Sequence, residues 1–363
     1  MLRLYDKSLW TALFLCFAFG LKAQDPVFSQ YFLNLNYLNP AFAGYTNDLT
    51  TNFNSRVQYF GVPGVMASNT ASANISCEEE TRLGIGLLAY HNVEGQGILQ
   101  TTTLSGQLSA NFPFTIRRRQ RTNKGLFSAG LQFGAGQKYL SWRNLSFSDQ
   151  YTPYLQGVQN PTSIAVQQSS SNVFLDLGAG LRSTYEFGSG RKPKFISLGA
   201  AAFHLNRPAQ SFLESNLKLE PRYTFYVFYY MGNPKKGRTK DLRYLSFGAL
   251  ADYQQGLQTH TLSVFKDLNE YMTVGLSVRR EDFLFLDRRA DAVIPHFVIK
   301  MNNLSVGVSY DWTLSPLGEE NTFGSAEIGV SWRFPGRNLC PGYRKLCAVK
   351  GFDMTHDMPN LFF

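Results

Sequence analysis

The sequence predicts an all-β protein, a transmembrane antiparallel β-barrel of about fourteen strands. Apolar and polar residues alternate along most of the chain, as they do in strands that separate lipid from water. The chain holds 30 Phe, 19 Tyr and 31 Gly, and only 17% of its residues are charged, which favours strands with one apolar face. After residue 24 no window approaches the roughly 18 apolar residues that a membrane-spanning helix needs, so helical spans are excluded.

The N-terminus has the features of a cleaved secretory signal. Arg3 and Lys7 supply positive charge, residues 9–19 are nearly all apolar, and Ala23 provides a small residue at the cleavage point. The apolar run is too short to be retained as a membrane helix. A lipoprotein signal is the alternative, but its Cys16 lies inside the apolar run.

The clearest alternation lies at 173–187, where Leu175 and Leu181 oppose Asp176 and Arg182. Strands with this period are expected at 49–60, 67–77, 82–93, 98–112, 125–140, 173–187, 194–205, 221–232, 243–253, 257–266, 271–280, 291–301, 303–313 and 323–334. The chain is thereby divided into a signal peptide, an N-terminal luminal or periplasmic segment, the barrel and a C-terminal periplasmic tail, at 1–23, 24–48, 49–334 and 335–363.

The connections indicate which way the barrel faces. Bacterial barrels have long outer loops and short periplasmic turns, and the long connections here are 141–172, 206–220 and 281–290. Basic residues gather in the inner connections, above all Arg117, Arg118, Arg119, Lys235 and Lys236. They would contact lipid phosphates or an acidic periplasmic protein. The net charge of +9 does not by itself indicate nucleic acid, and we expect none as a partner.

Several motifs together resemble the PorP/SprF family, which comprises outer-membrane components of the type IX secretion and gliding machinery of Bacteroidetes. They are QDPVFSQY at 24–31, NPAFAG at 39–44, RVQY at 56–59 with Gly61 and 63–64, HNVEG at 91–95, LNRP at 205–208 with 211–212, and SYDW at 309–312 with Ser315. The resemblance covers about residues 24–334. The polar loop at 141–172 and the tail at 335–363 depart from the family pattern.

The resemblance implies a non-enzymatic barrel in the outer membrane of a Gram-negative cell. The resemblance implies contact with periplasmic ring or peptidoglycan-associated proteins, and a link from these to a secreted adhesin with a type B C-terminal domain, so outer-membrane lipid and such proteins are the expected partners. It leaves open whether the chain serves the secretion core or one paired adhesin. A passive, porin-like solute channel is the alternative. The five histidines are scattered and form no catalytic motif, and we expect neither an enzyme nor a cofactor.

A barrel of this strand number would enclose a water-filled lumen. We hypothesise that residues 24–48 enter it as an extended partial plug that pairs with inward Asn52, Asn54, Arg56 and Gln58; the alternative is a tether at the periplasmic rim. The plug candidates are Asn34, Asn36, Asn39 and Pro40. Charges on the polar faces are expected to form a luminal network, with a solute filter as the alternative; they are Arg56, Asp176, Arg182, Glu186, Glu327 and Arg333.

Candidate partner contacts lie in one loop and in the tail. Arg207, Pro208 and Phe212 in an outer loop would either anchor a partner or stiffen the loop. Phe362 and Phe363 would form a periplasmic hook or be a frayed end. Cys340 and Cys347 are close enough in sequence to form a disulfide in an oxidising compartment, which leaves Cys77 unpaired; a metal site would need more ligands.

Overall fold

The computed structural model describes residues 25–46, 48–77, 83–95, 99–118, 121–141, 145, 147–150, 171–189, 192–210, 218–234, 242–283, 290–314 and 319–335. The regular elements are the helix α2 (Leu35–Leu38), the 3-10 helices η1 (Pro40–Phe42) and η3 (Ser148–Gln150), the helix α3 (Glu319–Thr322), and the strands β1 (Leu49–Gln58), β2 (Val65–Cys77), β3 (Leu83–Gly95), β4 (Leu99–Arg118), β5 (Arg121–Leu140), β6 (Phe174–Ser189), β7 (Lys192–Phe203), β8 (Arg222–Pro234), β9 (Leu242–Gln254), β10 (Leu257–Asp267), β11 (Met272–Phe283), β12 (Ala292–Met301), β13 (Leu304–Thr313) and β14 (Ser325–Phe334).

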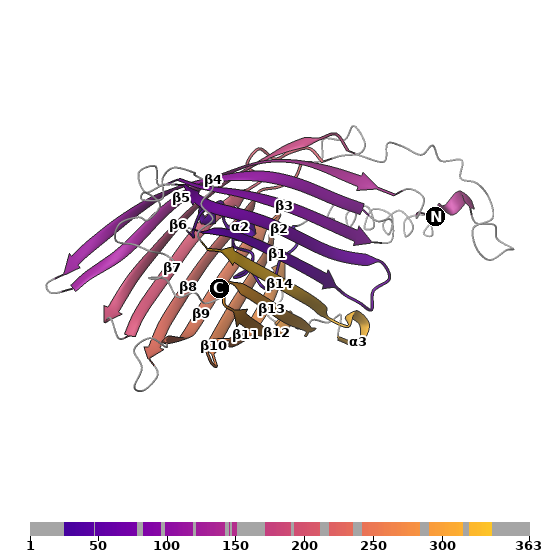
Figure 1. Cartoon of the computed structure of the whole chain (residues 1–363). Coiled ribbons are helices and arrows are strands. Elements are labelled where there is room, and N and C mark those ends of the chain that lie inside the picture. The colour runs from indigo at the N-terminus through magenta and orange to yellow at the C-terminus, as the bar shows by residue number, and fades with distance from the viewer. Residues whose placement is uncertain are drawn as a thin grey trace, which may run out of the picture.

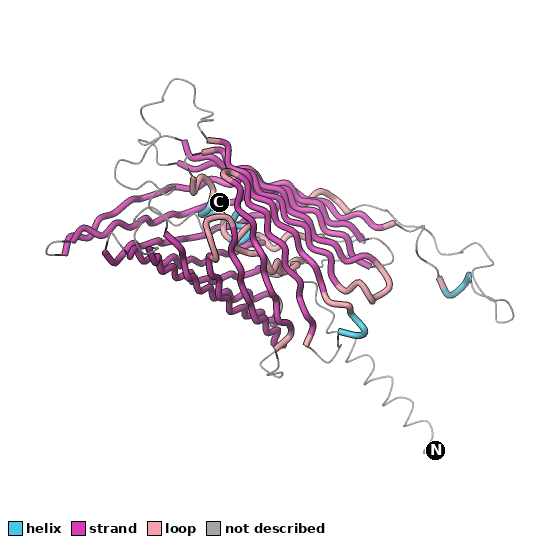
Figure 2. The backbone as a smooth tube through the Cα atoms, turned by 60° about the horizontal axis from the view of Figure 1, so that its bottom comes forward, coloured by secondary structure: helices cyan, strands magenta, loops and turns pink. Residues whose placement is uncertain are grey.

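The strands form one closed antiparallel barrel in which each strand pairs with its neighbours in sequence (Figures 1 and 2). The first and last strands close the barrel, with Leu49 opposite Phe334 and Arg56 opposite Glu327. The predicted fold class and strand number are confirmed, and each expected span overlaps one strand. Among the described residues, no helix is long and apolar enough to cross a membrane.

The two ends of the barrel differ. At one end, where β1 starts and β14 stops, successive strands are joined by turns such as 302–303 between β12 and β13; we call this the short-turn end. At the other, the long-loop end, lie the connections 141–173 and 204–221. Both ends of the barrel sheet therefore lie on the side that is periplasmic in bacterial barrels.

The connection expected at 113–124 is wrong, because β4 continues to Arg118 and β5 begins at Arg121. Alternation persists through this stretch: Phe114 and Ile116 lie on the same outward face as Phe112, and the Phe114 ring covers Gly125 on the paired strand. β3 pairs only with residues 99–110 of β4, so the rest of the hairpin projects past its neighbours at the short-turn end (Figures 1 and 2). We call residues 111–118 and 121–124 the arm.

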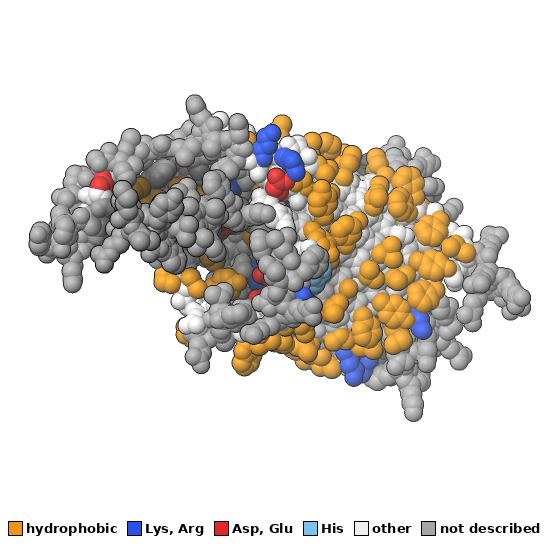
Figure 3. Space-filling view, turned by 180° about the vertical axis from the view of Figure 1, so that it is seen from behind, with side chains coloured by type: hydrophobic (Ala, Val, Ile, Leu, Met, Phe, Trp, Pro, Cys, Tyr) orange, Lys and Arg blue, Asp and Glu red, His pale blue; other side chains and the backbone are white. Residues whose placement is uncertain are grey.

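Alternation places apolar side chains outside and polar ones inside, as expected. On β6, Leu175 and Leu181 are 67% and 51% exposed, whereas Asp176 and Arg182 are 4% and 1% exposed. Figure 3 shows hydrophobic side chains spread over the outer wall with few charges among them. Exposed Leu and Phe on a closed wall are stable only where lipid replaces water around them.

The lumen is occupied by the chain's own N-terminal segment, residues 25–46, which we call the leader. Its apolar residues pack against the inner wall and form the main buried cluster with Tyr226, Phe228, Leu250, Phe265 and Val298; the leader residues are Tyr31, Phe32, Leu33, Leu38, Phe42 and Tyr45. Burying each such side chain contributes roughly 1.5 to 3 kcal/mol. The barrel therefore has an apolar core inside its polar wall.

The outward face allows a direct test of the lipid contact. Leu181, midway along β6, is replaced by Arg, and Tyr139, near the end of β5 at the long-loop end, is replaced by Arg as the matched control. We expect Leu181→Arg to lower the free energy of unfolding by about 2 to 4 kcal/mol and Tyr139→Arg by about 1 or less, because the cost of a charge falls toward the interface. Urea titration of the protein folded in lipid vesicles measures both. Equal losses of unfolding free energy in the two variants would contradict the assignment of the outward face to lipid.

Candidate functional site

The leader enters the lumen at the long-loop end through a group of charged residues that we call the entry clamp: Asp25, Asp176, His204 and Arg222. His204, which follows the last residue of β7, donates from Nε2 to Asp25 Oδ2 at 2.7 Å and from Nδ1 to Asp176 Oδ1 at 2.8 Å. Arg222 Nη1 lies 3.3 Å from the same Asp25 oxygen, and its guanidinium stacks over the Tyr37 and Phe203 rings. The start of the leader is therefore held to β6, β7 and β8.

The clamp fixes the protonation of its members. Burial alone would lower the pKa of His204, but Asp25 and Asp176 outweigh it and raise that pKa to about 9. Burial would raise the pKa of Asp25, and the positive charges of His204 and Arg222 hold it well below its usual value instead. At neutral pH His204 is thus an imidazolium that faces the carboxylate of Asp25.

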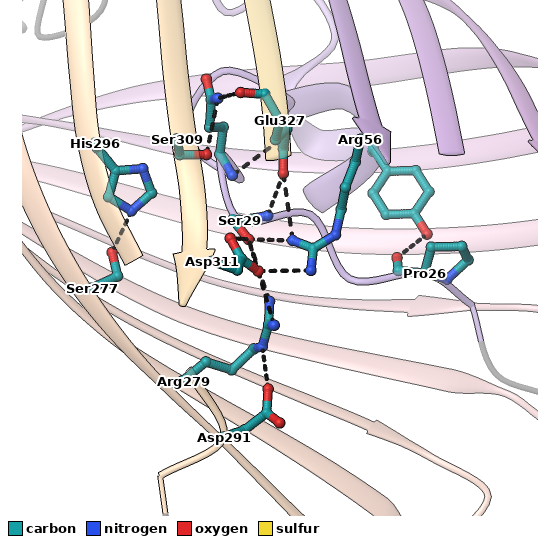
Figure 4. Close-up of polar contacts among 12 residues, drawn as sticks. Pro26, Ser29, Arg56, Ser277, Arg279, Asp291, His296, Ser309, Asp311 and Glu327 are labelled. Carbon is teal, nitrogen blue, oxygen red and sulfur yellow. Dashed lines mark hydrogen bonds and ion pairs between the residues drawn. The ribbon is translucent and has the colours of Figure 1, made fainter. Parts of the chain in front are cut away.

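Beyond the entry clamp, and still toward the long-loop ends of β1 and β14, the leader turns at Ser29 beside the junction of these two strands (Figure 4). The residues around it, which we call the seam cluster, are Ser29, Arg56, Arg279, Asp311 and Glu327. Arg56 Nη2 lies 2.7 Å from Asp311 Oδ2, and Arg279 Nη2 lies 2.9 Å from the same oxygen. Ser29 Oγ donates to Asp311 at 2.7 Å and accepts from Arg56.

Glu327 completes the seam cluster by capping the turn of the leader. Its carboxylate accepts from the backbone N–H of Ser29 at 2.7 Å and of Gln30 at 3.1 Å. The Gln30 amide in turn donates to the Glu327 carbonyl at 2.7 Å and to Ser309 at 3.1 Å. Gly307 and Gly329 leave room for the Gln30 side chain, because a Cβ at Gly307 would lie 2.5 Å from Gln30 Oε1.

The leader is not extended, which corrects the sequence expectation. After the turn at 29–33 it forms α2, and Asn39 then starts η1 by accepting from Ala41 N at 2.8 Å, with Pro40 at the first helical position. Asn36 faces β2 and β4 rather than β1, donating to Gln107 at 2.7 Å and accepting from Asn74 at 3.1 Å. Side chains leave a helix in more directions than they leave a strand. The leader therefore contacts several strands of the wall.

The NPAFAG motif is seated against three inward glycines of the wall. Asn39 donates to the carbonyls of Leu181 and Ala200 at 3.0 and 3.2 Å. A Cβ at Gly180 would lie 2.0 Å from Asn39 Oδ1, one at Gly130 would lie 2.4 Å from Ala41 N, and one at Gly84 would lie 2.1 Å from Ala43 O. The backbone of the leader thus approaches the wall at distances that only glycine permits.

The six charges expected to form one luminal network are divided among separate contacts. Arg56 and Glu327 belong to the seam cluster, and Asp176 belongs to the entry clamp. The guanidinium of Arg182 donates to Ser128 at 3.2 Å and stacks 4.7 Å over the Phe42 ring. Arg333 lies 3.7 Å from Asp48 at the short-turn end, and Glu186 is half-buried on β6.

The plug candidates Asn34, Asn36, Asn39 and Pro40 are all buried inside the barrel. Of the expected partner contacts, Arg207 is exposed and pairs with Glu220 at 2.7 Å, and Pro208 accepts from Leu219 N at 2.9 Å. Arg117 and Arg118 lie in the arm, and Cys77 ends β2. The remaining candidates lie outside the described residues: Arg119, Phe212, Lys235, Lys236, Cys340, Cys347, Phe362 and Phe363.

Sequence reasoning missed the residues that hold the leader most directly: Asp25, His204, Arg222, Arg279 and Asp311. Asp311 and Ser309 lie on the polar face of a strand expected in the sequence, and they belong to the motif SYDW. The alternation could therefore have placed them inside the lumen. Their convergence on Ser29 required the register of β13, β14 and β1.

The seam cluster yields a test with an internal control. We expect Arg56→Met to lower the free energy of unfolding by about 3 to 5 kcal/mol, because it leaves Asp311 and Glu327 buried with less compensating charge. Arg207→Met removes a similar pair whose side chains are 57% and 38% exposed, and should cost about 1 kcal/mol or less. Denaturant titration in detergent micelles measures both, and limited proteolysis within 25–46 reports release of the leader. Equal losses of unfolding free energy in the two variants would contradict the assignment of Arg56 to a buried charge cluster.

The entry clamp predicts a pH dependence. Since the pKa of His204 is raised from 6.5 to about 9, its contribution is complete below about pH 6.5 and is lost as pH rises through 9, and it amounts to on the order of 3 kcal/mol. We expect wild type to exceed His204→Gln in thermal stability at about pH 6 and to lose that advantage by about pH 10. Melting curves of both proteins at each pH measure it. A pH-independent difference would refute the charged clamp.

Among the described residues, no group of three His, Cys, Asp or Glu side chains could hold a metal ion.

No curated protein matches the sequence significantly. Among solved structures, Omp33 of Acinetobacter baumannii is 8% identical with a TM-score of 0.35, covering 79% of this chain and 99% of its own. The toluene transporter TodX of Pseudomonas putida is 9% identical with a TM-score of 0.34, covering 86% and 95%. At these scores the likeness carries no argument about function.

The family comparison covers most of the chain. The model of the family described as type IX secretion system membrane protein PorP/SprF matches residues 20–332. The match includes the whole leader and nearly all of the barrel. It is a family of secretion-system membrane proteins and not of enzymes. The chain therefore belongs to the PorP/SprF family of type IX secretion system membrane proteins.

Proposed function

We propose that the protein is a non-enzymatic outer-membrane component of the type IX secretion or gliding machinery. It holds a secreted or surface-anchored partner, an adhesin with a type B C-terminal domain, at the long-loop end. At the short-turn end it contacts periplasmic ring or peptidoglycan-associated proteins. The mature chain begins after cleavage of the signal peptide and resides in the outer membrane.

One observation supports an assembly role over a solute channel: the leader runs through the lumen from one end to the other. It starts beside His204 and Gln254 at the long-loop end and ends beside Thr50 and Arg333 at the short-turn end, with Thr46 Oγ1 2.7 Å from Thr50 Oγ1. A pore needs a continuous water-filled path, whereas this lumen is crossed by packed side chains and buried hydrogen bonds. The leader thus acts as a plug.

The ends of the barrel carry features suited to two different partners. The arm extends the sheet beyond the short-turn end, and its sequence includes Arg117 and Arg118, whose charge suits an acidic periplasmic partner. At the long-loop end, Arg207 is exposed with a positive φ of 46°, a conformation that an ordered loop must hold against strain. A rigid exposed Arg is a suitable anchor for a partner.

The plug can be removed without shortening the chain. We expect Gly130→Val to displace the leader, because its side chain would overlap Pro40 and Ala41, and to raise single-channel conductance in a planar bilayer well above that of wild type. Gly106→Val is the matched control: it lies one strand away, and the nearest atom to its Cβ would be 4.0 Å distant. Gly180→Val, which meets Asn39 at 2.0 Å, provides a second displacing variant. A wild-type conductance equal to that of both displacing variants would favour the porin-like alternative.

The partner assignment is tested by purifying the tagged protein from detergent-solubilised cell envelope. We expect periplasmic and cell-surface components of the secretion machinery to copurify with wild type. Replacing Arg117 and Arg118 by Gln should lose the periplasmic components selectively, and replacing Arg207 by Ala should lose the surface component selectively. Recovery of abundant porins alone, from wild type and variants alike, would contradict the assembly role.

A further inference from the structure

Between the leader and the wall formed by β3 to β6, the long-loop half of the lumen contains a cavity of about 270 Å³. Asp25 and Tyr37 of the leader form one side, and Tyr90, Glu94, Lys138 and Phe174 form the other. Leu219, from the connection between β7 and β8, lies at its rim. The cavity is close to the lower end of the range for small-molecule sites.

The cavity is closed toward the short-turn end. Gln132, which lines it, accepts from Gln107 at 2.8 Å, and Gln107 also donates to the Asn36 carbonyl at 2.8 Å. Asn36 donates back to Gln107 Oε1 at 2.7 Å. This chain of buried amides joins the wall to the leader below the cavity. A molecule that enters from the long-loop end is therefore retained, not conducted.

Two opposite charges line the cavity without a salt bridge to any described residue, and they attract each other across it. The entry clamp satisfies Asp25, Asp176, His204 and Arg222 among themselves. Lys138 makes no side-chain hydrogen bond or ion pair to any described residue, and Glu94 accepts only from Asn92. The ammonium is half-buried and the carboxylate is exposed, and two such charges facing one chamber favour a ligand that carries the complementary pair.

The register separates these two charges enough to admit a ligand between them. Lys138 pairs with Thr101, and Thr101 pairs with Asn92, two residues before Glu94 on the same face. Lys138 and Glu94 thus lie on strands roughly 10 Å apart, with β4 between them. The Tyr90 and Tyr37 rings, stacked with centroids 5.8 Å apart, and Phe174 supply apolar surface beside the gap. Such surfaces stack favourably against an aromatic ring.

We propose that this cavity binds a small zwitterion with an aromatic side chain, an amino acid or dipeptide. Lys138 receives its carboxylate and Glu94 its ammonium group. The ring packs against Tyr90 and Phe174. This site is independent of the adhesin and periplasmic contacts proposed above, because it requires only the folded barrel and its leader.

Calorimetric titration of the purified full chain in detergent tests the site with four probes: L-phenylalanine, glycyl-L-phenylalanine, 3-phenylpropanoate and phenethylamine. We expect saturable binding of at least one zwitterion, at least tenfold tighter than either singly charged analogue. Lys138→Met should weaken it tenfold or more and also abolish phenylpropanoate binding, and Glu94→Gln should weaken it similarly and also abolish phenethylamine binding. Whichever zwitterion binds more tightly distinguishes the amino acid from the dipeptide.

Lys266→Met and Glu270→Gln, at exposed positions outside the cavity, are the matched controls and should leave the affinities unchanged. Lys138→Arg should retain binding, which keeps the test decisive if Lys138→Met fails to fold. The proposal is overturned if no zwitterion binds saturably, if the singly charged analogues bind as tightly, or if the control variants weaken binding as much as the cavity variants.

Discussion

The whole structure depends on how the buried charges at the junction of the first and last strands are satisfied. Arg56 on β1 and Glu327 on β14 are register partners, and Asp311 on β13 lies within ion-pair distance of Arg56. The leader supplies the missing polar atoms: a hydroxyl for Asp311 and two backbone N–H groups for Glu327. Unpaired buried charges are strongly destabilising. The leader therefore completes the hydrogen bonding of these buried charges and is a structural part of the barrel.

The same constraint explains why the leader is rich in asparagine, aromatic residues and small residues. A polar inner wall offers amides and hydroxyls at many angles, and an Asn can both donate and accept. Asn39 uses both capacities, capping η1 while it holds two carbonyls of β6 and β7. The aromatic residues fill the space between these contacts: the Tyr31 ring stacks on Phe228 and the Phe42 ring stacks on Tyr226. Inward glycines allow the leader backbone to approach the wall.

Much of this fold was predictable because a period of two fixes both the secondary structure and the face of each residue. Asp176 and Arg182 could be placed inside, and Leu175 and Leu181 outside, from alternation alone. The arm was missed because a basic run at 117–121 suggested a turn, although Phe112, Phe114 and Ile116 continue the alternation. The leader conformation was missed for a different reason. Leu and Asn alternate at 33–37 as they would in a strand, but tertiary contacts to Gln107 and Asn74 decide in favour of α2.

A plugged barrel with a chamber at one end separates two tasks that a pore would combine. The leader occupies the lumen and is joined to the wall by the seam cluster and the amides of Asn36 and Gln107. Beside the entry clamp, the leader and the wall enclose a chamber in the long-loop half of the lumen. The leader connects the two ends inside the wall, since it contacts the wall near both of them. Because the leader is anchored by buried ion pairs at one level and by glycine-permitted backbone contacts at another, its displacement would alter contacts near both ends of the barrel.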